Sequence, residues 1–121
     1  MPDPFPLLVP GATPDAELAD VHAPYDGSLI ATVERGGPQV VEKALDTAYR
    51  LFRDRDAWLG AAQRTAILRG AAVIMQERRD ELAVEAAREG GKPLVDSLVE
   101  VDRAIDGVHE CVELLRTQHG E

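Results

Sequence analysis

Apolar residues recur every three or four positions over much of the chain, which is typical of amphipathic helices. The first such stretch predicts a helix from Pro38 to about Arg53, with proline in its favoured place at the first turn. The apolar face of this helix is expected to comprise Val41, Ala44, Leu45, Ala48 and Phe52. A second helix is predicted to begin near Ala61. Its apolar face is expected to comprise Ile67, Ala71, Ile74 and Met75.

A third helix is predicted after the polar run at residues 77–80, with Asp80 as its N-cap. Its buried side is expected to comprise Leu82, Ala83, Ala86 and Ala87. Glutamates recur every four residues in this part of the chain, at Glu77, Glu81, Glu85 and Glu89. This spacing would align like charges along one ridge, which is mildly destabilising, and we interpret the ridge as a solvated helix face.

The helical pattern is interrupted at residues 89–93, Glu-Gly-Gly-Lys-Pro. Inside a helix a glycine costs about 1 kcal/mol and a proline about 3 kcal/mol, so the chain is predicted to turn here. A fourth helix follows, with apolar residues in steps of four and three at Leu94, Leu98, Val101, Ile105, Val108, Val112 and Leu115. Val95, Ala104 and Cys111 widen this stripe, which favours packing on a globular core over a two-stranded coiled coil.

Extended structure is predicted near the N-terminus. Residues 1–19 are rich in Pro, Asp and Ala without a sustained period, and they are expected to form an irregular arm. From Asp20 onward, two short runs flank the Asp26-Gly27 pair, which indicates a β-hairpin. The chain is therefore expected to be mostly α-helical, with about four helices and one N-terminal β-hairpin. Its length of 121 residues supports a single domain.

Charge and composition exclude some functions. The formal net charge of -9 argues against nucleic acid and anionic membranes as partners, since both attract basic surfaces. The N-terminus has no basic region and its apolar run is broken by prolines, so no signal peptide is predicted. No apolar stretch approaches membrane-spanning length. The single cysteine excludes an internal disulfide, and we expect a cytoplasmic location.

Few residues are candidates for chemistry. A phosphate-binding loop is excluded at Gly91-Lys92, because Ala86 and Pro93 stand where that motif needs Gly and Ser or Thr. No G-x-G-x-x-G dinucleotide motif follows a predicted strand. Cys111 follows Glu110 and is flanked by apolar residues, so we expect a neutral thiol that packs as a small buried side chain. Surface or hydrogen-bonded roles are expected for His22, His109 and His119.

Several of these motifs together resemble the N-terminal part of the aldehyde dehydrogenase superfamily. The resemblance includes the Glu-x-Gly-Lys-Pro motif at residues 89–93, the arginine-led helix beginning near Arg64 and Trp58 behind the first helix. It also includes the hairpin pattern Pro-x-x-Gly-x-x-Ile-Ala-x-Val at residues 24–33. The resemblance covers about residues 20–121, which it identifies as the N-terminal part of an aldehyde dehydrogenase cofactor-binding domain.

The resemblance implies an α/β fold for the whole family, in which this segment supplies the first hairpin and a layer of helices. It also implies oxidation of an aldehyde to a carboxylic acid with NAD or NADP. The family's Pro-Trp-Asn-Phe segment, cofactor helix, general-base glutamate and Gly-Gln-x-Cys nucleophile are not among these 121 residues. No catalytic, cofactor-binding or metal residue is therefore assigned. The chain by itself is expected to bind no cofactor and to be inactive.

Two functions remain open. The chain is either an N-terminal fragment of such an enzyme, which packs with the remainder of the fold, or a stand-alone helical interaction module. The module would self-associate or bind a full-length relative, because an isolated chain would expose its apolar helix faces. The resemblance also suggests that Glu89 meets the carbonyl groups of Val21 and His22 around a monovalent cation. A charged helix end is the alternative interpretation of Glu89.

Overall fold

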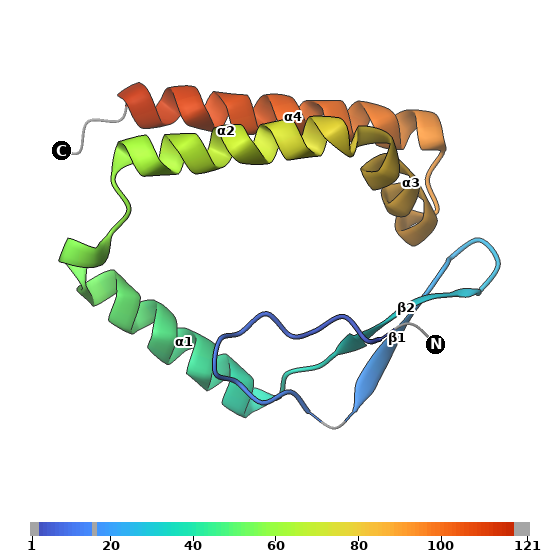
Figure 1. The fold of residues 1–121 in the computed structure, drawn as a ribbon. Helices are drawn as coiled ribbons and strands as arrows, with labels where there is room; N and C mark the ends of the chain where they lie inside the picture. Colours follow the sequence, from blue (N-terminus) through green and yellow to red (C-terminus); the bar gives the residue numbers. More distant parts are fainter. Residues whose placement is uncertain (1–2, 16, 118–121) are drawn as a thin grey trace. The chain divides into compact units, whose positions relative to one another are not determined.

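The computed structural model describes residues 3–15 and 17–117 of the chain. Contacts divide the chain into two compact units, Met1–Trp58 and Leu59–Glu121, called unit 1 and unit 2 below. The length alone had suggested a single domain. Four α-helices and one two-stranded antiparallel sheet make up the described regular structure, together with one short 3-10 helix (Figure 1). The mostly helical fold and the N-terminal hairpin are thus confirmed.

Unit 1 contains the hairpin. Strand β1 (Leu18–His22) pairs antiparallel with strand β2 (Leu29–Glu34), and a register shift follows Val21. Gly27 lies in the connecting turn with φ of 73°, a left-handed conformation that glycine adopts without steric cost. The first strand begins two residues earlier than the predicted Asp20, within the segment expected to be an irregular arm.

The N-terminal arm is attached to β2 by backbone hydrogen bonds. The Phe5 N–H donates to the Thr32 carbonyl at 2.8 Å, and the Phe5 carbonyl accepts from the Glu34 N–H at 3.0 Å. This is a parallel bridge beside β2. Further along, the Asp15 N–H donates to the Arg35 carbonyl at 2.9 Å. Part of β2 therefore has backbone partners on both sides, which stabilises a hairpin that would be marginal alone.

Helix α1 (Pro38–Arg53) has the predicted bounds, but its buried side differs from the predicted one. Val40 is buried, whereas Val41, Leu45 and Phe52 are more than half exposed. Val40 faces the arm, where residues 11–13 lie close to it. Among the described residues of unit 1, Arg55 and Trp58 contact Phe52, whereas Val41 and Leu45 stay exposed. The face thus has the predicted helical spacing, and most of it is exposed within unit 1.

A short 3-10 helix, η1 (Arg55–Ala57), folds Trp58 back onto α1. The indole N–H of Trp58 donates to the Leu51 carbonyl at 3.1 Å. The guanidinium carbon of Arg55 lies 4.7 Å from the ring centroid of Phe52 and 4.3 Å from that of Trp58. Cation–π attraction to both rings holds this corner of the chain together.

Unit 2 consists of three helices, α2 (Ala61–Glu77), α3 (Arg79–Gly90) and α4 (Leu94–Thr117). α4 runs back alongside α2, and α3 packs against α4 near its beginning (Figure 1). The core of the unit is formed by Ala83, Val101 and Ile105, with Met75, Leu82 and Leu98 packed around it. None of the helices that the structure describes combines the length and the apolar content that crossing a bilayer requires.

The buried side of α2 is rotated from the predicted one. Ile67 and Ile74 belong to the predicted apolar face, yet their side chains are 58% and 54% exposed. The residues that α2 buries or half-buries against its neighbours are Thr65, Leu68, Ala71, Ala72, Met75. α2 is apolar on more than one side, so periodicity alone could not show which side meets α4.

The apolar stripe of α4 at Leu98, Val101, Ile105, Val108, Val112 and Leu115 is called the seam below. The seam is buried or half-buried, but the residues that widen it are exposed. Val101, Ile105 and Val112 are buried, and the other members of the seam beyond Leu94 are half-buried. Val95, Ala104 and Cys111 are exposed. The expectation that these three pack on a core is therefore wrong within the described structure. The reason is that the neighbouring helices meet α4 along the seam and leave its flank uncovered.

The start of α3 also differs from its prediction. Its N-cap is Arg78, which makes no side-chain capping bond, and Asp80 lies inside the first turn. Asp80 cannot be the cap because α2 continues to Glu77, which leaves a single residue between the two helices. In the first turn its negative charge still favours the positive end of the helix. The buried side of α3 is confirmed at Leu82, Ala83, Ala86 and Ala87, which are buried or half-buried.

Ser97 is a buried polar residue that the sequence pattern did not reveal. Its side chain is fully buried near the start of α4, and its Oγ has no hydrogen-bond partner among the described residues. A hydroxyl in this situation costs about 1–3 kcal/mol relative to a satisfied one.

The predicted break between the third and fourth helices is confirmed. α3 ends at Gly90, and Gly91 has φ of 65° in the left-handed region. Lys92 Nζ then lies 2.7 and 2.8 Å from the two carboxylate oxygens of Glu100, so the turn is tied to α4. α4 begins at Leu94, directly behind Pro93. Gly91 allows the chain to reverse direction, and Pro93 prevents α3 from continuing.

Substitution of Gly91 in this turn and of Gly70 inside α2 should have opposite effects on stability. Gly91→Ala forces a Cβ into the left-handed conformation and should lower the free energy of unfolding by about 1 kcal/mol. Gly70→Ala is the matched control, because a Cβ there meets nothing within 4 Å. It should raise the free energy of unfolding by up to about 1 kcal/mol through helix propensity. Urea unfolding followed by circular dichroism measures both, and equal shifts in the same direction would contradict the assignment.

Candidate functional site

Cys111 is the first candidate, and the structure places it differently from the sequence analysis. Its side chain is exposed on α4, so the expectation of a buried thiol is wrong. It lies on the uncovered flank of α4, next to an opening toward α2. We therefore describe the surroundings of Cys111 first.

These surroundings form an apolar groove of about 470 Å³ between the start of α2 and the end of α4. We call it the α2–α4 groove. Its lining residues are Leu59, Arg64, Ile67, Leu68, Cys111, Leu114 and Leu115. Arg64 is the one charged residue among them, and it has no hydrogen-bond or ion-pair partner in the part of the chain that the structure describes. The groove can accept an apolar group together with a negative charge.

Neither of the two described histidines, His22 and His109, lines this groove. The Nδ1 of His22 lies 3.0 Å from the Gly27 carbonyl and donates to it across the hairpin turn. This confirms a hydrogen-bonded role for His22. His109 is exposed on α4, and His119 lies outside the described residues. Within residues 3–15 and 17–117, no three His, Cys, Asp or Glu side chains gather as a metal site would require.

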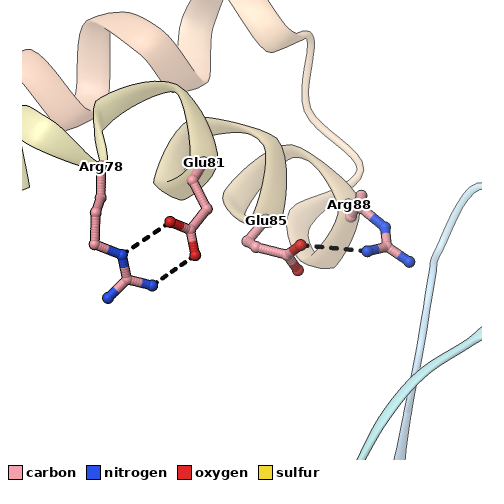
Figure 2. Close-up of polar contacts among 4 residues, drawn as sticks. All are labelled: Arg78, Glu81, Glu85 and Arg88. Carbon is pink, nitrogen blue, oxygen red and sulfur yellow. Dashed lines mark hydrogen bonds and ion pairs between the residues drawn. The ribbon is translucent and has the colours of Figure 1, made fainter.

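The expected ridge of four glutamates is interrupted, because Glu77 ends α2 and the other three lie on α3. Arg78 donates to both carboxylate oxygens of Glu81, at 2.9 and 2.6 Å (Figure 2). One turn further on, Arg88 Nη1 lies 3.3 Å from Glu85 Oε1. The hydrogen bonds from Arg78 hold the pKa of Glu81 below its usual value. All four glutamates are exposed, which confirms a solvated face.

Glu89 lies in the last turn of α3 and is exposed. The carbonyl groups proposed to join it around a monovalent cation belong to Val21 and His22 in β1. Glu89 is in unit 2 and β1 is in unit 1. The cation hypothesis therefore stays a prediction, next to the alternative of a charged helix end.

A second polar feature links α3 to α4. Arg79 donates to both carboxylate oxygens of Asp102, at 2.5 and 2.7 Å, and its Nη1 lies 2.9 Å from Asp80 Oδ1. The two residues of the main pair are 23 positions apart, with side chains 30% and 47% exposed. The hydrogen bonds that Arg79 donates to Asp102 lower the pKa of Asp102 and raise the pKa of Arg79. This bidentate pair fixes the start of α3 on α4.

The lowered pKa of Asp102 predicts a loss of stability in acid. A carboxyl with a depressed pKa in the folded state contributes stability above its unfolded value of about 3.9. That contribution is lost as the pH falls through the lower, folded value. Asp102→Asn should therefore lower the melting temperature at pH 7 and weaken its decline below pH 4.

The matched control for this measurement is Asp106→Asn. Asp106 is exposed one turn further along α4, and it has no polar partner in the part of the chain that the structure describes. This variant should keep the melting temperature and the pH dependence of the parent. Equal behaviour of the two variants in thermal melts from pH 7 to pH 2 would show that the pair with Arg79 does not stabilise the fold.

Comparisons with known proteins add to this geometry. Residues 12–121 match the sequence pattern of the aldehyde dehydrogenase family. The chain is 36% identical over 101 residues to an aldehyde-dehydrogenase-like protein of Sinorhizobium fredii, covering 84% of this chain and 20% of the relative. It is 32% identical over 107 residues to the D-glyceraldehyde dehydrogenase (NADP(+)) of Thermoplasma acidophilum, covering 87% of this chain and 21% of the relative. The chain thus spans about a fifth of the length of these relatives.

Proposed function

The chain belongs to the aldehyde dehydrogenase family, and from this we propose that it is the N-terminal part of a protein that oxidises an aldehyde to a carboxylic acid with NAD or NADP. The family match over residues 12–121 is the observation that carries the proposal. The relative from Thermoplasma acidophilum, named as an NADP(+)-linked dehydrogenase of D-glyceraldehyde, supports this reaction class. The aldehyde and the choice between NAD and NADP are left open within the proposal.

In this proposal residues 20–121 are a structural part of the cofactor-binding domain and carry none of its chemistry. The exposed apolar side chains of α1, α2 and α4 support that role, because they suit packing against further parts of a larger fold. Cys111 does not stand in the family's Gly-Gln-x-Cys context, and it is not proposed as a nucleophile. We also propose a cytoplasmic location, with neither nucleic acid nor membrane as a partner, in keeping with the net charge of -9.

The proposal predicts that the purified 121-residue chain does not oxidise aldehydes. NADH or NADPH formation, followed by absorbance with either cofactor and a panel of short aldehydes, should stay at the rate without protein. A full-length relative assayed in parallel serves as the positive control. Cofactor-dependent turnover by the purified chain would overturn the proposed inactivity.

A second function is favoured by the α2–α4 groove. As a separate product, the chain would be a helical interaction module that self-associates or binds a full-length relative. The supporting observation is the number of large apolar side chains exposed on unit 2, among them Leu59, Ile67, Ile74 and Leu114. Exposed apolar groups that gather around a groove are typical of interaction sites.

This second function predicts concentration-dependent association. In sedimentation experiments at micromolar concentrations, the average mass should rise above 13.1 kDa as the concentration increases. Binding of a dye that reports apolar surface should fall over the same range, because association covers that surface. A monomer at all concentrations that unfolds cooperatively and binds no dye would count against the module.

A further inference from the structure

We draw no further inference here: the strongest candidate, the apolar groove between the start of α2 and the end of α4, leaves Leu59, Ile67 and Leu114 exposed, and nothing in the structure shows what covers them.

Discussion

The packing of α4 along its neighbours is the contact on which the helical unit depends. α4 is 24 residues long, and its seam of Val101, Ile105 and Val112 is buried. α3 has only 12 residues, a length at which an isolated helix is marginal in water. It is held in place by Ala83 in the shared core and by the pair between Arg79 and Asp102. Without the seam of α4, α3 would lose both of these contacts.

Helix bounds and the hairpin could be predicted because they depend on local backbone chemistry. Pro38 and the residues around Gly91 act on their own neighbourhood, and the structure begins and ends helices there. Burial depends on the partner of a helix, which the local pattern does not contain. Val41 and Ile67 have the periodicity of buried residues, yet both are exposed. Pattern alone therefore identified amphipathic helices more reliably than it identified the core.

The candidate site could be predicted less well, because its parts are far apart in the sequence. The groove brings Arg64 to the same opening as Cys111, and no local spacing connects these positions. Cys111 looked like a buried small residue because apolar neighbours surround it along α4. It is exposed because it lies beside the buried seam of α4, on a flank that the neighbouring helices leave uncovered.

The exposed apolar side chains of α2 follow from one property of its sequence: this helix is apolar on more than one side. The side with Ala72 meets the rest of unit 2, and the side with Ile67 and Ile74 is uncovered. A helix that is apolar on several sides is typical of the interior of a larger assembly. The relatives are about four times as long as this chain, so in a full-length protein further residues are available to cover that side. In a separate 121-residue product a second copy or a full-length relative would have to supply the cover. Both proposed functions therefore depend on the same requirement, that an apolar surface meets the groove around Arg64.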